Sequence, residues 1–138
     1  MSEKTLQRNI FQRILGICKT QQPKDPGCWT LEKSQVVVDL SRVPELAEPD
    51  SAIRLELPTF PNRVLVIHTF SGKYYAFRNR CSHGKRRMDL IPGTEQVQCC
   101  SLGKSIFSKE GKMVSGAAKK PVHAYHVKHE ENHLIIEF

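Results

Sequence analysis

The sequence has no apolar run that approaches the roughly 18 residues needed to cross a lipid bilayer. Its N-terminal segment also lacks the uninterrupted apolar region of a signal peptide, because Arg8 and Arg13 interrupt it. We therefore expect a cytoplasmic protein in a reducing compartment, with no membrane span.

Catalytic signatures are missing as well. The chain contains no nucleophile elbow, no phosphate-binding glycine-rich loop and no Ser/His/Asp signature. The acidic residues Glu45, Glu48 and Asp50 are scattered over one loop and do not indicate a carboxylate pair. These absences argue against an autonomous enzyme.

Acidic residues are scarce relative to basic ones. The 14 Asp and Glu stand against 21 Lys and Arg, which gives a formal net charge of +7. Such a balance is compatible with nucleic acid, an anionic membrane surface or an acidic protein partner. No aromatic-interleaved basic repeat or nucleic-acid motif accompanies the charge, so we expect no nucleic-acid partner.

The five cysteines are an odd number, which argues against a complete disulfide framework and fits metal binding or thiol use better. Cys18 and Cys28 flank a segment that breaks regular structure. They could pair or join a metal site, although buried or idle thiols suit a reducing compartment better. The other three are Cys81, Cys99 and Cys100.

Residue patterning predicts an N-terminal helix followed by a β domain. Leu6, Ile10, Ile14 and Cys18 recur every four residues, which predicts a helix over 4–18. Prolines and a glycine then break the pattern, so we interpret residues 1–34 as helix and linker. The remainder predicts an all-β domain of short antiparallel strands over 35–138. Strands are expected within 35–40, 52–58, 61–70, 73–79, 95–100, 105–116 and 121–138, with turns at 71–72, 110–111 and 130–132.

Two loops of this β domain carry soft metal ligands. Cys81 and His83 follow one predicted strand, and Cys99 and Cys100 end another. Thiolate and imidazole are the side chains that hold iron–sulfur clusters and zinc. Each loop also has a glycine nearby, which permits a tight turn of the backbone. The two loops could therefore hold a metal centre between them.

From about residue 35 to 138 the chain resembles a Rieske-type domain. That family has the pattern C-x-H, about fifteen to seventeen residues, then C-x-x-H; here it reads "CSH", fifteen residues, then "CCSL". The stretches "GKYYAFRNRCSHGKRRM", "VQCCSLGKSIFSKEGKMVSG" and "SGAAKKPVHAYHV" are also similar to the family. The resemblance implies three stacked antiparallel sheets, with a small cluster-binding subdomain at about 79–116.

The resemblance also implies a ligand set for a [2Fe–2S] cluster. Cys81 and Cys99 would hold the buried iron, and His83 would hold the outer iron. Leu102 stands at the fourth ligand position and can ligate nothing. Lys104 and Ile106 stand where higher-potential members have a serine and a tyrosine that donate hydrogen bonds to cluster sulfurs, so an assembled cluster would have a lower potential.

Three explanations of Leu102 stay open. Cys100 could replace the missing histidine and give a Cys3His set, although adjacent residues of an extended strand point to opposite sides. The fold could instead have no cluster and serve as a structural or interaction subunit. Alternatively, Cys81, His83, Cys99 and Cys100 could bind a single Zn²⁺.

The function implied by the resemblance is one-electron transfer through a [2Fe–2S] centre, in a carrier that is a component of a larger redox system. Four basic residues, Lys85, Arg86, Arg87 and Lys104, would lie near the tips of both loops. Such a basic collar would steer an acidic redox partner towards a bound cluster. A merely solvated loop surface is the competing interpretation.

Overall fold

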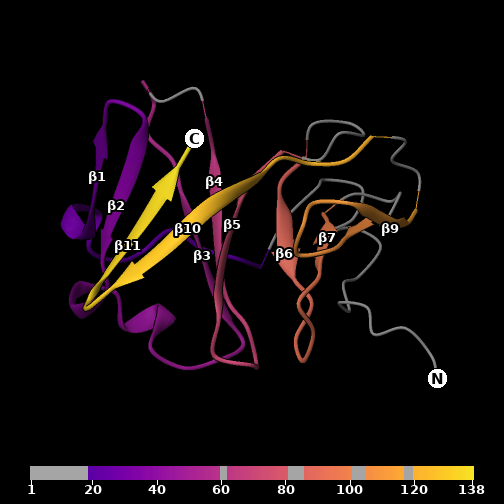
Figure 1. Cartoon of the computed structure of the whole chain (residues 1–138), viewed down its shortest axis with the longest axis horizontal. Helices are drawn as coiled ribbons and strands as arrows, with labels where there is room; N and C mark the ends of the chain where they lie inside the picture. The colour runs from indigo at the N-terminus through magenta and orange to yellow at the C-terminus, as the bar shows by residue number, and fades with distance from the viewer. Residues whose placement is uncertain (1–18, 60–61, 81–85, 101–104, 117–119) are drawn as a thin grey trace.

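A computed structural model describes residues 19–59, 62–80, 86–100, 105–116 and 120–138. These residues are mostly β (Figure 1). Three short 3-10 helices accompany the strands, at Pro26–Cys28, Leu40–Arg42 and Pro44–Leu46. The strands are β1 (Trp29–Glu32), β2 (Gln35–Asp39), β3 (Ser51–Leu55), β4 (Val64–His68), β5 (Tyr74–Arg78), β6 (Met88–Leu90), β7 (Val97–Cys99), β8 (Ile106–Phe107), β9 (Met113–Ser115), β10 (Ala124–Glu130) and β11 (His133–Glu137).

The larger sheet has the strand order β1-β2-β11-β10-β5-β4-β3, with antiparallel neighbours throughout. Strand β10 joins its two halves. It pairs with β11 from His126 to Glu130, whereas Ala124 and Tyr125 pair with β5. The predicted layered antiparallel sheets are therefore present, and two of them are connected through β10.

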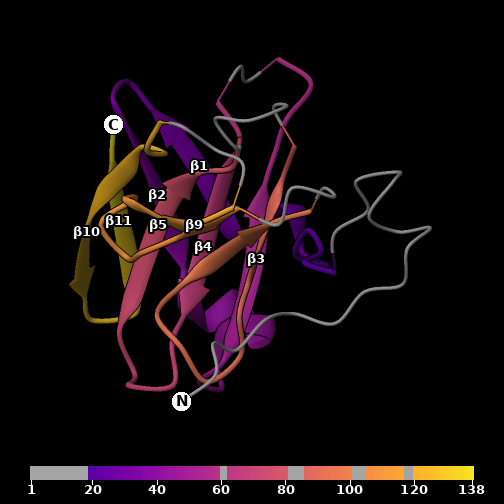
Figure 2. The ribbon, with the colours of Figure 1, turned by 90° about the vertical axis from the view of Figure 1, so that its right-hand side faces the viewer.

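The smaller sheet has the order β6-β7-β8-β9 and lies beside β3, β4 and β5, on the side away from β1, β2 and β11 (Figure 1). Strands β3, β4 and β5 lie side by side in the view turned by 90° (Figure 2). The small sheet thus forms a separate layer against the middle of the large one.

Strand β4 is buried over its whole length because its two faces contribute to two different cores. Val64 and Val66 face a core enclosed by the large sheet, together with residues of β2, β3 and β11. Leu65 and Ile67 face a second core shared with Phe77 and with the small sheet. Alternation with period two therefore explains how one apolar strand holds both layers together.

The segment that follows residues 117–119 closes over the small sheet. Val122 donates its backbone N–H to the carbonyl of Gly111 at 2.9 Å, and the Val122 side chain lies in the second core. Gly111 has a φ of +85° and donates its own N–H to Ser108. The turn expected at 110–111 therefore also serves as a docking point for the chain that leads into β10.

The strands expected from the sequence are present, and the structure adds two more. Strand β1 lies within the segment expected to be helix and linker, and β6 lies between the strands expected within 73–79 and 95–100. Leu57 continues the alternation of Ile53 and Leu55, but it is 44% exposed because β3 ends at Leu55. The predicted helix over 4–18 lies outside the described residues. Within the described ranges, no helix is long and apolar enough to span a membrane.

Candidate metal centre

Strands β5 and β7 lead into the two loops that the sequence singles out. Cys81, His83, Lys85, Leu102 and Lys104 lie outside the described residues, so their predicted roles stay predictions. The structure describes the residues on either side of these loops. They show which side chains the scaffold directs towards the loops and which it turns into the core.

Cys99 is the last residue of β7 and is fully buried. It pairs with Met88 of β6 and donates its backbone N–H to Ser105 O at 2.8 Å. Its side chain belongs to the second core, as does that of Val97, and it is a thiol rather than a half-cystine. The scaffold therefore fixes Cys99 firmly at the base of the second loop.

Cys100 directly follows the strand and differs from Cys99 in its chemistry. It is fully buried, and its backbone N–H donates to Arg87 O at 2.9 Å. Its sulfur is disulfide-bonded. A half-cystine cannot supply a thiolate, so Cys100 can serve as a metal ligand only after reduction.

Asn79, two residues before Cys81, connects the two layers at this end of the molecule. It is fully buried, and its Oδ1 accepts the backbone N–H of Met88 at 2.8 Å. Its Nδ2 has no hydrogen-bond partner within the described part of the chain. A buried amide donor of this kind is costly to leave unpaired. Sequence reasoning missed it, because an asparagine beside a cysteine is not a signal by itself.

Arg87, predicted as part of a basic collar, is held by an internal ion pair. Its Nε and Nη2 donate to the two carboxylate oxygens of Glu56 at 2.6 and 2.8 Å, and Arg54 Nη1 lies 3.1 Å from Glu56 Oε2. Burial of Glu56 opposes its ionisation, but the hydrogen bonds from Arg87 and Arg54 outweigh it and hold the pKa of Glu56 below its usual value. Of the other predicted collar residues, only Arg86 is described, and it is exposed.

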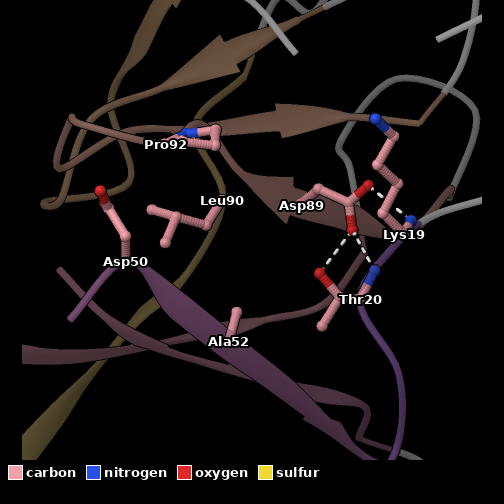
Figure 3. A pocket seen from close by; sticks show the side chains of 7 residues that line it. All are labelled: Lys19, Thr20, Asp50, Ala52, Asp89, Leu90 and Pro92. Carbon is pink, nitrogen blue, oxygen red and sulfur yellow. Dashed lines mark hydrogen bonds between the residues drawn. The ribbon is translucent and has the colours of Figure 1, made fainter. Parts of the chain in front are cut away.

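Asp89 of β6 is a buried carboxylate that lies beside a cavity of about 220 Å³ (Figure 3). It accepts the backbone N–H groups of Lys19 and Thr20 at 2.8 Å each, and the Thr20 hydroxyl as well. Three donors therefore converge on one carboxylate, which ties the start of the described chain to the small sheet. We interpret this group as structural.

Comparison with known proteins places this geometry in a family. A family model described as the Rieske [2Fe-2S] domain matches residues 36–126, well over half of the chain. The chain belongs to the Rieske family. No curated protein matches the chain as a relative.

Several solved structures share the Rieske fold. The ferredoxin of carbazole 1,9a-dioxygenase from Nocardioides aromaticivorans IC177 is 19% identical, with a TM-score of 0.61, over 76% of this chain and 98% of that one. A chain from the complex of reduced oxygenase and oxidized ferredoxin in carbazole 1,9a-dioxygenase is 16% identical, with a TM-score of 0.58, over 80% and 93%. The plasma membrane Rieske protein PetC3 from Synechocystis PCC 6803 is 18% identical, with a TM-score of 0.51, over 63% and 86%. At these identities the likeness concerns the fold.

The residues of this chain fit a Rieske cluster in part. Cys99 offers a thiol at the base of the second loop, and Asn79 offers an unpaired buried N–H of the kind that sulfide or thiolate sulfur accepts. Against these, position 102 holds leucine, and Cys100 is a half-cystine. Among the described residues, no group of three or more His, Cys, Asp or Glu could hold a metal ion. A full ligand set therefore requires the loop residues and a change at Cys100.

The Glu56 ion pairs make the stability of this end of the domain depend on pH. Because the pKa of Glu56 is lowered in the folded state, the contribution of its ion pairs to stability is fully present above the unfolded pKa of about 4.5 and is lost as the pH falls through the lower, folded pKa. At pH 7 we expect Glu56→Gln to lower the free energy of unfolding by about 1.5–3 kcal/mol.

Urea unfolding of the parent and Glu56→Gln between pH 3 and pH 7 measures this difference. It should narrow towards the acidic end, whereas Glu48→Gln, at an exposed position, should stay within about 0.5 kcal/mol of the parent throughout. If Glu56→Gln lowers the free energy of unfolding by the same amount at every pH, the ion pairs do not have the proposed role.

Proposed function

We propose that this chain is a Rieske-type electron carrier that transfers one electron at a time through a [2Fe–2S] centre, as a component of a larger redox system. The observation that carries the proposal is the family match over residues 36–126, because this range contains Cys81, His83 and Cys99 in the family's ligand order. The ferredoxin neighbours of carbazole 1,9a-dioxygenase support a small carrier that works with a separate enzyme. The chain itself would not be an autonomous catalyst.

Each ligand position has a distinct role in this proposal. Cys81 and Cys99 would supply thiolates to one iron, His83 an imidazole to the other, and Cys100, once reduced, the fourth ligand. The bound centre supplies a one-electron redox couple. The proposal includes a cytoplasmic, reducing compartment, which would keep these cysteines as thiols. Ile106 is buried and offers no hydroxyl to a cluster sulfur, so the reduction potential would be lower than in family members that have a tyrosine there.

The partner that we propose is an acidic redox protein. Lys85, Arg86, Arg87 and Lys104 would lie beside the loops and would raise the rate of encounter with a negatively charged surface.

A second candidate function is a cluster-free Rieske-fold subunit that binds partners through its β surface and N-terminal segment. Leucine at position 102 and the disulfide at Cys100 favour this alternative, because both remove a ligand from the second loop. A single Zn²⁺ held by Cys81, His83, Cys99 and reduced Cys100 is the remaining possibility for the same residues.

Iron and acid-labile sulfide analysis of anaerobically purified protein tests the proposal. We expect red-brown protein with about two irons and two sulfides per chain, and a Cys99→Ser variant that loses at least nine-tenths of both. Cys28→Ser is the matched control. Cys28 is also a buried thiol, but it lies in the first core, whereas Cys99 lies in the second, so Cys28 should not ligate the cluster.

Colourless parent protein without iron or sulfide, even after anaerobic reconstitution in the presence of a dithiol reductant, would contradict the electron-carrier proposal. Zinc in place of iron would support the single Zn²⁺ site at the same four residues instead. If Cys28→Ser and Cys99→Ser lose iron equally, the loss reflects damage to the fold rather than the removal of a ligand.

A further inference from the structure

The side chain of Asn79 lies between the two layers, at the end of β5 that leads into the first loop. Tyr75 and Phe77 of β5 contribute to the second core, and alternation places the Asn79 side chain on the same face. Its Oδ1 accepts the backbone N–H of Met88, the first residue of β6, at 2.8 Å. The Asn79 carboxamide therefore connects the large sheet to the small one.

Hydrogen bonds fix the backbone of Asn79 as well. Its N–H donates to Arg63 O at 2.7 Å, beside the start of β4, and Arg80 donates its N–H to Arg78 O at 2.8 Å. A bond between residues two apart closes a γ-turn, so the chain bends at Asn79, two residues before Cys81. Because the backbone and Oδ1 are both held, the direction of the Nδ2 group is fixed too.

The partner of Oδ1 determines which way the carboxamide is oriented. A backbone N–H can only donate, so the atom that faces Met88 N must be Oδ1 and not Nδ2. Nδ2 is buried and has no hydrogen-bond acceptor among the residues that the structure describes. An unpaired buried donor costs more free energy than an ordinary hydrogen bond contributes, which indicates that an acceptor belongs beside it.

The position of Asn79 indicates the chemistry of that acceptor. Met88, which donates to Asn79, pairs with Cys99, and Cys81 follows Asn79 by two residues. The amide is thus close in the fold to one predicted cluster ligand and close in the sequence to another. Thiolate and sulfide sulfurs carry negative charge and accept N–H groups, whereas hydrocarbon side chains of the second core such as Val97 accept none.

We propose that Nδ2 of Asn79 donates a hydrogen bond to a sulfur of a bound [2Fe–2S] centre and so raises its reduction potential. The inference rests on the proposed function, because it needs the centre through which that function works. Reduction makes the cluster sulfurs more negative, so a donor stabilises the reduced form more than the oxidised form. Asn79 would thereby offset part of the lower potential that we expect from Ile106, which offers no hydroxyl.

Redox titration of the anaerobically reconstituted full chain tests this inference with Asn79→Ala. Loss of the donor should shift the equilibrium towards the oxidised form by about tenfold, which lowers a one-electron potential by about 59 mV. The variant should still bind iron and sulfide, because Asn79 is not a ligand.

Thr69→Val is the matched control for the loss of a buried hydrogen bond. Thr69 is also fully buried, and its hydroxyl donates to Lys73 O at 3.2 Å. It follows the last residue of β4, whereas Asn79 lies beside the first, so the two positions are at opposite ends of the strand. The substitution should destabilise the fold but change the redox equilibrium by less than about twofold.

Pulsed electron paramagnetic resonance of the reduced centre detects the hydrogen bond directly in the parent protein. When the side-chain amides of asparagine are labelled with nitrogen-15, we expect a coupling between the label and the unpaired electron. Asn79→Asp keeps an acceptor for the Met88 N–H and should remove this coupling. Asn132→Asp, at an exposed position between β10 and β11, should retain it. This measurement keeps the inference testable if Asn79→Ala fails to fold.

Three results in an iron-loaded parent would overturn the inference. They are a spectrum without nitrogen-15 coupling, an unchanged potential in Asn79→Ala, and an equal shift of potential in Thr69→Val. In each case iron and sulfide are still bound, so the electron-carrier proposal stands. A parent without iron and sulfide would contradict both proposals, and metal analysis of the parent therefore distinguishes the two failures.

Discussion

Replacing Gly111 with alanine is expected to lower the free energy of unfolding by about 3–5 kcal/mol, through backbone strain and overpacking together. The φ of Gly111 is +85°, which residues other than glycine rarely adopt, and an added Cβ would clash with the carbonyl oxygen of Val122. Relief of that contact requires the segment before β10 to move away, which breaks the hydrogen bond from Val122 N to Gly111 O. Chemical unfolding followed by circular dichroism measures the loss.

Gly72→Ala is the control that separates the close contact from the strain. Gly72 has almost the same φ, +83°, but nothing lies within 4 Å of a Cβ at that position. Only the backbone conformation opposes the alanine, so we expect a loss of about 1 kcal/mol. Equal losses at Gly72 and Gly111 would show that the close approach of Val122 does not hold the two layers together.

Local patterns were sufficient to predict most of the large sheet. Alternation identified β3, and apolar β-branched runs identified β2 and β4, because a half-buried or fully buried strand requires those side chains. The same rules missed β1, since Trp29–Glu32 has a single buried residue and is held mainly by its pairing with β2. They also missed β6, which is only three residues long.

The candidate site was harder to predict than the fold, because its important contacts connect residues far apart in the chain. Nothing local to Glu56 indicates that Arg87 will bind it, and nothing around Asn79 indicates that it will join β5 to β6. Spacing and residue type did identify Cys99 as a fixed position at the end of a strand. They could not establish the chemical state of Cys100, which is disulfide-bonded, because residue spacing does not indicate whether a cysteine is oxidised.

The combined Leu102→His/Cys100→Ser variant is expected to bind a [2Fe–2S] cluster that Cys100→Ser alone has lost. If reduced Cys100 is the fourth ligand, serine at that position should lower the iron content at least tenfold. Histidine at position 102 would then restore the family's own ligand pattern in the same loop. Because a neutral imidazole would replace a thiolate, the restored cluster should have a reduction potential higher than that of the parent by roughly 100 mV or more. Iron and sulfide analysis, electron paramagnetic resonance and redox titration measure these changes.

Four proteins, the parent, Cys100→Ser, Leu102→His and the double variant, distinguish the remaining explanations of leucine at position 102. Iron retained in Cys100→Ser would show that Cys100 is not a ligand and that the disulfide is independent of the metal. Iron absent from the parent but present after Leu102→His would show that the loops survive and only one ligand is missing, as in a cluster-free subunit. Iron absent from all four would mean that the scaffold no longer holds a cluster at all. We therefore expect the function of this Rieske protein to depend on the residue at position 102 and on whether Cys100 is reduced.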